Sequence, residues 1–268
     1  MANDDITAVI ACFNYGRYLR EAVDSALVQG ARAVLVDDGS TDPDTHSVLE
    51  SLPSEVVVIR QQNRGVCHAR NAGLACVETA YAIVLDADDR LAPGALEALR
   101  APLEANPQLG FSFGTMRFFG AWEGTLDFPD YDPYRLLHRH TIGLSALMRR
   151  ELFEATGGFD PAFDHYEDWE LWLNALAHDL RGRKVDAVTL EYRRHAGASK
   201  LGEDRRRYRQ HRAALRRKHA ALYARAGEFA REGGVGLAQR ALYRWFWGAR
   251  PVPARLEALM HRRRFGRA

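Results

Sequence analysis

The chain has 268 residues, 47% of them hydrophobic, and a formal net charge of +2. It is long enough to bury a large core, and it contains no apolar run of the length that predicts a transmembrane helix. Its three cysteines, Cys12, Cys67 and Cys76, are an odd number and lack metal-ligand spacing, which argues against a disulfide framework. Because residues 1–5 also have no signal-peptide character, we expect a reduced, cytoplasmic compartment.

The small net charge conceals an uneven distribution along the chain. Residues 201–268 hold 18 Lys and Arg against 5 Asp and Glu, whereas residues 1–200 hold 19 against 30. An acidic body followed by a basic segment is more informative than the total charge. We therefore expect a main domain at residues 1–200 and a basic helical extension at residues 201–268.

The first third of the chain alternates short apolar runs with amphipathic segments. Apolar runs rich in β-branched residues predict strands, and apolar positions three or four residues apart predict helices. The predicted strands are residues 6–13, 33–36, 56–59 and 81–85, and the helices between them are residues 19–27, 43–52 and 66–77. Four strands alternating with three helices predict βαβ units in a parallel sheet.

The remainder of the chain is less regular. Further strands are predicted at residues 111–113, 116–119, 144–148 and 185–192, and further helices at residues 93–103, from Arg150, from Glu167, and at residues 205–218 and 223–231. Residues 120–141 are rich in aromatics, Pro and Asp and have little periodicity. A loop of this length is usually functional or disordered, and we expect it to lie over a site.

Acidic residues follow two of the predicted strands. Asp37 and Asp38 follow strand 33–36, and Asp86, Asp88 and Asp89 follow strand 81–85. Ligands of open α/β sheets bind beyond the carboxyl ends of the strands, and crowded carboxylates repel one another unless a cation is present. Mg²⁺ favours carboxylate oxygens together with substrate phosphates. Each acid alone is explained by turn or helix-cap chemistry, but the ordered set predicts a metal and phosphate site.

Six segments, in order, resemble the family 2 glycosyltransferases, which have the GT-A fold and invert the anomeric centre. The segments are residues 9–19, 36–42, 63–73, 85–89, 157–160 and 167–172, and the resemblance covers roughly residues 6–200. Six motifs in register are far more specific than one. The resemblance implies an α/β, Rossmann-like GT-A domain with a mostly parallel sheet flanked by helices, followed here by the helical extension.

The resemblance also implies a nucleotide-sugar site, residue by residue. Asp38 would bind the base of the nucleotide, expected to be uracil, and Phe13 would pack near it. Arg70 would face the nucleotide, and Asp86 would touch its ribose. The donor would therefore be a UDP-sugar.

Three further residues would carry the chemistry. Asp88 would hold Mn²⁺ or Mg²⁺ against the diphosphate, His195 would lie near both, and Asp168 would be the catalytic base. Breaking a sugar–diphosphate bond builds negative charge on the leaving group, and the attacking hydroxyl must lose a proton. The acceptor is left open as a carbohydrate, a lipid-linked molecule or a small molecule.

Two other functions stay open at this point. One is a phosphohydrolase that uses Asp86 as a nucleophile, which would form a covalent aspartyl phosphate. The other is a non-catalytic module that binds sugars or polyanions. Trp169 and Trp172 could line a sugar site, although their helical spacing also predicts core packing.

The basic extension has two interpretations. Basic amphipathic helices near Trp245, Phe246 and Trp247 are typical of contact with an anionic membrane surface, here the inner face. Alternatively, these helices pack on the main domain and expose their Arg residues. No nucleic-acid motif is present, and no nucleic-acid partner is expected.

Overall fold

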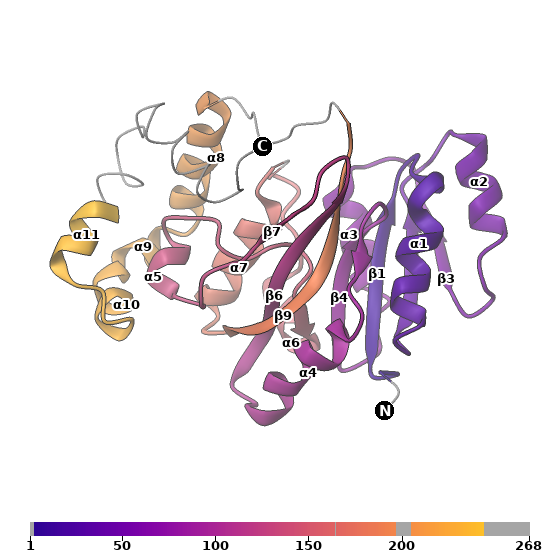
Figure 1. Ribbon diagram of the computed structural model, residues 1–268. Coiled ribbons are helices and arrows are strands. Elements are labelled where there is room, and N and C mark those ends of the chain that lie inside the picture. Colours follow the sequence, from indigo (N-terminus) through magenta and orange to yellow (C-terminus); the bar gives the residue numbers. More distant parts are fainter. Residues whose placement is uncertain (1–2, 164, 197–204, 244–268) are drawn as a thin grey trace.

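The computed structural model of the chain describes residues 3–163, 165–196 and 205–243. The first four predicted strands form one half of a mixed sheet (Figure 1): β3 (Val57–Arg60), β2 (Arg32–Asp37), β1 (Ile6–Cys12) and β4 (Tyr81–Asp86), in that order and all parallel. Helices α1 (Gly16–Leu27), α2 (Pro43–Glu50) and α3 (Val66–Leu74) connect them. The expected βαβ arrangement is confirmed.

The second half of the sheet is mixed. Strand β8 (Leu147–Arg149) runs antiparallel to β4 and to β6 (Leu109–Gly120), and β6 runs parallel to β9 (Arg181–Arg194). Two short strands, β5 (Arg90–Leu91) and β7 (Gly124–Leu126), pair with β9 and β6. The helices of this half are α4 (Ala95–Ala105), α5 (Pro133–Leu136), α6 (Arg150–Thr156) and α7 (Glu167–Ala177).

Several predicted boundaries need correction. The predicted strands at residues 111–113 and 116–119 are one strand, β6, which is bulged around Gly114, where a side chain would collide with Thr189. The last strand is longer than residues 185–192, since its first half also pairs with β6. The loop at residues 120–141 contains β7 and α5.

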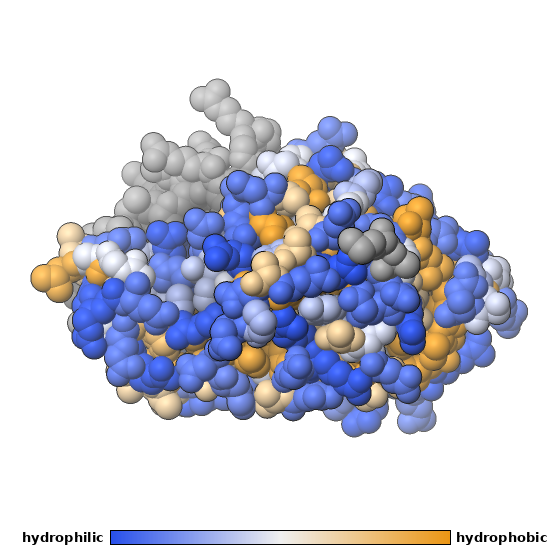
Figure 2. Space-filling view, turned by 90° about the horizontal axis from the view of Figure 1, so that it is seen from below, coloured by the Kyte–Doolittle hydropathy of each residue, from blue (hydrophilic) through white to orange (hydrophobic). Residues whose placement is uncertain are grey.

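Two apolar layers hold the sheet between helices. Side chains of β1 alternate between them: Ile10 packs with α1 and α4 in one layer, and Val9 packs with α3 and α7 in the other. This explains why β1 is apolar except for Thr7, as is typical of buried parallel strands. The face seen in Figure 2 is mainly hydrophilic, with apolar residues in separate groups.

The described part of the extension forms four helices: α8 (Arg205–Lys218), α9 (Ala220–Ala224), α10 (Ala226–Glu232) and α11 (Leu237–Tyr243). The predicted helix at residues 223–231 is thus divided, with the break at Arg225. These helices gather at one end of the molecule, beside α5 and α7 (Figure 1). Leu215, Leu222 and Phe229 are buried in the same apolar cluster as Trp169.

A buried ion pair strengthens this contact. Glu170 of α7 is fully buried, and its Oε1 lies 2.7 Å from Lys218 Nζ and 2.9 Å from His219 Nε2. The described part of the extension therefore packs on the main domain. Trp245, Phe246 and Trp247 lie outside the described residues, and the division of domains at residue 200 stays a prediction. None of the described helices is long and apolar enough to cross a membrane.

Candidate active site

The carboxyl end of β2 leads into a turn that fixes Asp38. Gly39 adopts a left-handed φ of +74°, and a side chain on it would meet Asn63 N at 2.7 Å, so this turn requires glycine. The Asp38 carboxylate is buried and accepts hydrogen bonds from Arg64 N (3.0 Å), Gly65 N (2.9 Å) and Gln61 Nε2. Asp38 thus joins the end of β2 to the start of α3. Because each carboxylate oxygen has two acceptor sites, Oδ2 can accept a further bond.

Arg70 joins the end of β4 to the start of α7. Its guanidinium is only 4% exposed and bonds Asp86 Oδ1 and Glu167 Oε1, each at 2.7 Å. Burial lowers the pKa of Arg70, but the two carboxylates outweigh burial and raise its pKa above the ordinary value. Arg70 was expected to face a nucleotide, and the structure places it between two acids. Its Cζ also lies over the ring of Phe159, 5.2 Å from the ring centroid.

Asp88 and His195 form a second pair at the same end of the sheet. Asp88 Oδ2 lies 2.8 Å from His195 Nε2, although the residues are 107 positions apart. The adjacent Asp89 is buried and accepts a hydrogen bond from Arg193 N. Burial, followed by the charges of Asp86 and Asp88, raises the pKa of Asp89 well above its ordinary value. The crowding of acids expected from the sequence is therefore present.

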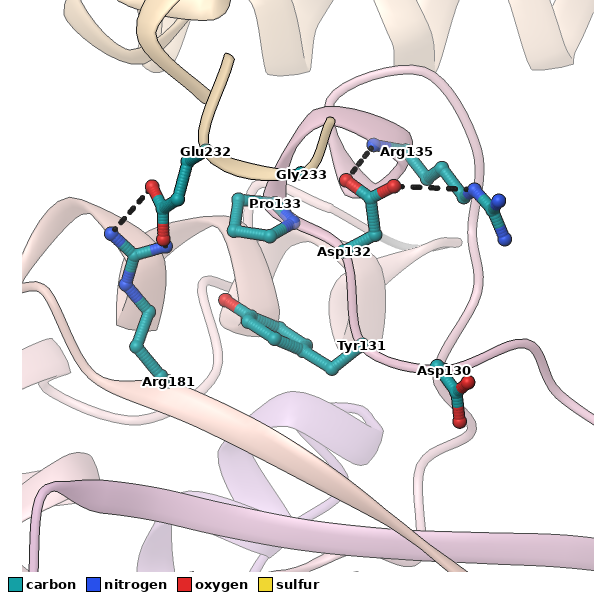
Figure 3. Close-up of a pocket in the computed structure, with 8 residues that line it drawn as sticks. All are labelled: Asp130, Tyr131, Asp132, Pro133, Arg135, Arg181, Glu232 and Gly233. Atoms are coloured by element: carbon teal, nitrogen blue, oxygen red, sulfur yellow. Dashed lines mark hydrogen bonds and ion pairs between the residues drawn. The ribbon is translucent and has the colours of Figure 1, made fainter. Parts of the chain in front are cut away.

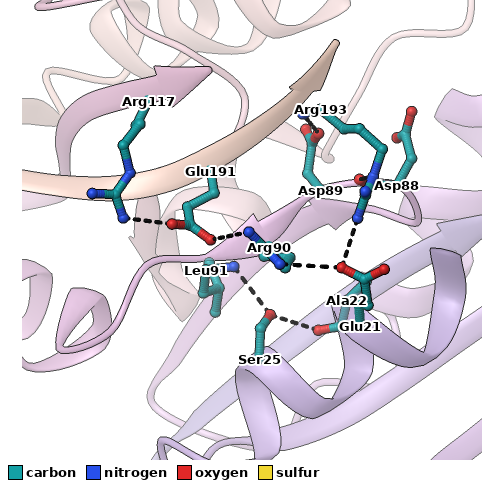
Figure 4. Close-up of polar contacts among 10 residues, drawn as sticks. All are labelled: Glu21, Ala22, Ser25, Asp88, Asp89, Arg90, Leu91, Arg117, Glu191 and Arg193. Atoms are coloured by element: carbon teal, nitrogen blue, oxygen red, sulfur yellow. Dashed lines mark hydrogen bonds and ion pairs between the residues drawn. The ribbon is translucent and has the colours of Figure 1, made fainter. Parts of the chain in front are cut away.

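Arg193 fixes the acidic turn from the opposite strand, as Figure 4 shows. Its Nε donates to Asp88 O at 2.8 Å, and its guanidinium also pairs with Glu21 of α1. Arg90 joins Glu21 to Glu191 of β9. Sequence reasoning missed Arg193, whose only signal was its place two residues before His195.

Among the described residues, no three His, Cys, Asp or Glu side chains gather as a ready metal site. Asp88 and His195 do provide two adjacent donors, an oxygen and a nitrogen. Mg²⁺ is usually held by one or two carboxylates together with substrate phosphates and water. The donor set therefore fits a divalent cation that is completed by a bound diphosphate.

Asp168 is held apart from this group, in the first turn of α7. Its Oδ1 accepts a hydrogen bond from Trp169 N, and its Oδ2 lies 2.9 Å from His140 Nε2. Burial would raise the pKa of Asp168, but His140 and the hydrogen bonds outweigh burial and lower it. Burial and the charge of Asp168 raise the pKa of Glu167. The environment thus moves the pKa values of these two neighbouring acids apart and keeps Asp168 ionised.

The aromatic residues near the site differ in exposure. Phe13 and Tyr15, just beyond β1, are 43% and 42% exposed. Trp169 and Trp172 are fully buried; Trp169 Nε1 donates to Leu136 O, and Trp172 stacks on Phe111. Neither tryptophan lines an open sugar site, so core packing is the correct interpretation for both.

A pocket of about 390 Å³ opens elsewhere, between the segment before α5, the start of β9 and the end of α10 (Figure 3). Its lining includes the ion pair between Arg181 and Glu232. It contains none of the seven residues predicted for the donor site and the base. The acidic strand ends, with their paired side chains, remain the candidate active site.

The fold, with acidic residues at the carboxyl ends of its parallel strands, is of the GT-A class. The structure resembles that of Staphylococcus aureus TarS 1–349 in complex with UDP-GlcNAc, with a TM-score of 0.63 and 16% identity over 91% of this chain and 78% of that one. The sequence model of glycosyl transferase family 2 matches residues 7–157. The chain belongs to this family.

Two relatives show how much of the chain is similar in sequence to other glycosyltransferases. The chain is 34% identical to an uncharacterized glycosyltransferase of Nostoc over 39% of its own length, and it spans only 34% of that relative. It is 26% identical over 72% of its length to WfaP of Escherichia coli, a UDP-Glc:alpha-D-GlcNAc-diphosphoundecaprenol beta-1,3-glucosyltransferase, of which it covers 78%.

Proposed function

We propose that this protein is an inverting, metal-dependent glycosyltransferase that moves a sugar from a UDP-sugar to an acceptor hydroxyl, with Asp168 as the general base. The observation that carries the proposal is the position of Asp168. It is a partly exposed carboxylate, and it stands one residue from Glu167, which Arg70 joins to the acidic end of β4. The proposed base is thus linked to the acidic end of β4 but lies outside it.

The donor site would be assembled from the strand ends. Asp38 and the exposed ring of Phe13 would contact the base, and Asp86 would contact the ribose. Asp88 and His195 would hold Mn²⁺ or Mg²⁺, which when bound would stabilise the charge that develops on the departing diphosphate. Arg70 would act indirectly, by positioning Asp86 and Glu167, because its guanidinium is already paired with both.

The reaction would be a single displacement. The acceptor oxygen bonds to the anomeric carbon while the bond from that carbon to the diphosphate breaks. The electron pair of the broken bond leaves with UDP. The acceptor proton passes to Asp168, which lies outside the metal pair and keeps its charge for this purpose. Attack from the face opposite the leaving group inverts the anomeric centre.

Similar proteins support the choice of substrates. The TarS structure holds UDP-GlcNAc, and the name of WfaP describes a UDP-glucose donor and a diphosphoundecaprenol-linked acceptor. We therefore propose a UDP-linked donor and a lipid-linked or glycan acceptor. A thermal-shift panel of nucleotide sugars, with and without Mn²⁺, tests the donor, because a ligand at 100 times its Kd adds about 2.7 kcal/mol. A covalent aspartyl phosphate on Asp86 would instead support the phosphohydrolase alternative.

Replacing Asp88 with Ala is expected to weaken Mn²⁺-dependent binding of UDP at least tenfold, on the order of 1.4 kcal/mol. The fold should persist, because the change relieves repulsion with Asp86 and Asp89. Calorimetry of UDP with and without Mn²⁺ measures the effect, and Asp44→Ala on the exposed start of α2 is the control. Unchanged Mn²⁺-dependent affinity in Asp88→Ala would rule out this role.

We place the protein in the cytoplasm, with its end able to contact anionic lipid at the inner membrane face. Residues 244–268 carry seven Arg and one Glu as well as Trp245 and Trp247. Each basic residue near such a surface contributes about 1 kcal/mol, and salt screens the attraction. Sedimentation with anionic vesicles should therefore retain the full chain at low salt and lose it at high salt. A chain ending at Tyr243 that binds equally well would contradict this assignment.

A further inference from the structure

The geometry points to His140 as a positioning residue that controls the base. This inference rests on the proposed role of Asp168 as that base. We propose that the neutral imidazole of His140 holds the Asp168 carboxylate for proton transfer, and that the protonated imidazole switches this base off. The chain would then transfer sugar only when His140 is neutral.

The first support is the contact itself. His140 lies in the segment between α5 and β8, and its Nε2 is 2.9 Å from Asp168 Oδ2. The other carboxylate oxygen already accepts a hydrogen bond from Trp169 N at 2.8 Å. Both oxygens therefore have a close polar neighbour, which limits how the carboxylate can turn. Its side chain is 15% exposed, so a lone pair can still meet an acceptor hydroxyl.

The second support is that the imidazole is itself held in place. Its ring stacks on the indole of Trp169, with centroids 6.2 Å apart and an interplanar angle of 20°. It also meets the ring of Tyr166 edge-on, at 6.0 Å. Trp169 is fully buried and anchors the same segment by donating to Leu136 O. A mobile surface histidine would have none of these contacts.

The backbone next to the base is also constrained. Tyr166, immediately before α7, has a φ of +61°, an uncommon left-handed conformation for a residue with a side chain. Strained residues of this kind persist only where the surroundings fix them, and they are frequent at functional sites. Tyr166 packs against Trp169 and against Tyr208 of α8, so the main domain and the extension both fix the start of α7.

The charges around the pair make the protonation state of His140 decisive. Arg70 of α3 and Glu167 of α7 also act on Asp168, and they are already paired with each other. A neutral imidazole at this distance would leave the carboxylate able to accept the acceptor proton. An imidazolium adds a full positive charge at 2.9 Å, which lowers the basicity of the carboxylate. Histidine is the side chain that changes charge in this pH range.

The pH profile of UDP release tests the proposal. The probes are UDP-GlcNAc and UDP-glucose, with water as the acceptor, at saturating donor and Mn²⁺. The wild-type rate should fall several-fold as the pH is lowered from 8 to 5.5, because the proposal requires a neutral imidazole. In His140→Gln, which keeps a neutral donor for Asp168, the rate should vary by no more than about twofold over this range. His178→Gln, an exposed histidine at the end of α7, should keep the wild-type profile.

A spectroscopic measurement tests the contact without turnover. The wild type should show a slowly exchanging, downfield imidazole N–H resonance that is missing in both His140→Gln and Asp168→Asn. A wild type without this resonance, or a His140→Gln variant with the wild-type acid limb, would overturn the proposal. Asp168→Asn distinguishes a failure of the proposed function from a failure of the role of His140. If this variant keeps the wild-type rate, the proposed function fails. If it loses the rate while His140→Gln keeps the wild-type profile, only the role of His140 fails.

Discussion

Asp168→Asn is expected to slow sugar transfer by about 10²–10⁴-fold, the usual contribution of a positioned general base. Asparagine keeps the shape of the side chain and can still accept the hydrogen bond from Trp169 N, but it cannot take up a proton. UDP affinity should change little, because Asp88 and His195 are untouched. Single-turnover rates with the donor bound, together with calorimetry of UDP, measure the two effects separately.

The matched control is Glu167→Gln, one residue earlier. A glutamine there can still accept the bond from Arg70, although it loses the charge, so its effect on the rate should be smaller than that of Asp168→Asn. The product provides an independent check. A single displacement turns an α-linked donor into a β-linked product, and proton NMR of the first product reads this directly. An α linkage from an α donor would contradict the mechanism even if Asp168 were essential.

Arg70→Met is expected to lower the free energy of unfolding by about 3 kcal/mol. Removing one partner of a buried ion pair typically costs about 3–5 kcal/mol, because the other partner is left buried without its counter-ion. The lower end applies here, since the Asp86 side chain is 35% exposed and water can reach it. Methionine fills much of the space that the arginine stem occupied. Urea unfolding at pH 7 measures the loss as a shift of the midpoint.

The pH dependence of this loss provides a second test. Without Arg70, Glu167 stays largely buried beside Asp168, so the folded variant binds protons more readily than the unfolded chain. Stability relative to the wild type should therefore recover as the pH falls toward 4. Arg20→Met, which removes an exposed ion pair with Asp24, is the control and should change stability by less than about 1 kcal/mol. A constant gap between Arg70→Met and the wild type from pH 7 to pH 4 would contradict the buried-charge explanation.

The parallel half of the sheet was predictable because its signal is local. Residues 6–12 are apolar except for Thr7, a pattern typical of a strand buried on both faces. The bulge at Gly114 was not predictable, since it depends on how closely β9 approaches β6. The boundary at Arg225, which ends α9 and begins α10, was not predictable either, because the helical periodicity of residues 223–231 runs through it.

Some residues of the candidate site could likewise be predicted from the sequence, and others could not. Asp38, Asp86, Asp88 and Asp168 follow or begin regular elements, so their neighbourhood could be inferred from the order of those elements. His140 could not, because it lies in a segment without periodicity and meets Asp168 only through the packing of Trp169. Arg70 was expected at the site, but its two partners are set by burial, which forces a guanidinium to take a carboxylate on each side.

The buried Glu170 has a consequence for how the chain is made. Its two cationic partners, Lys218 and His219, are synthesised almost fifty residues later. Domains fold from the N-terminus as the chain grows, so β1 to β4 can assemble early. Helix α7, which begins with Glu167 and Asp168, reaches its final environment only when residue 219 has left the ribosome. A nascent protein that has already formed the β1–β4 half therefore lacks these two partners of Glu170 until α8 and residue 219 have been made.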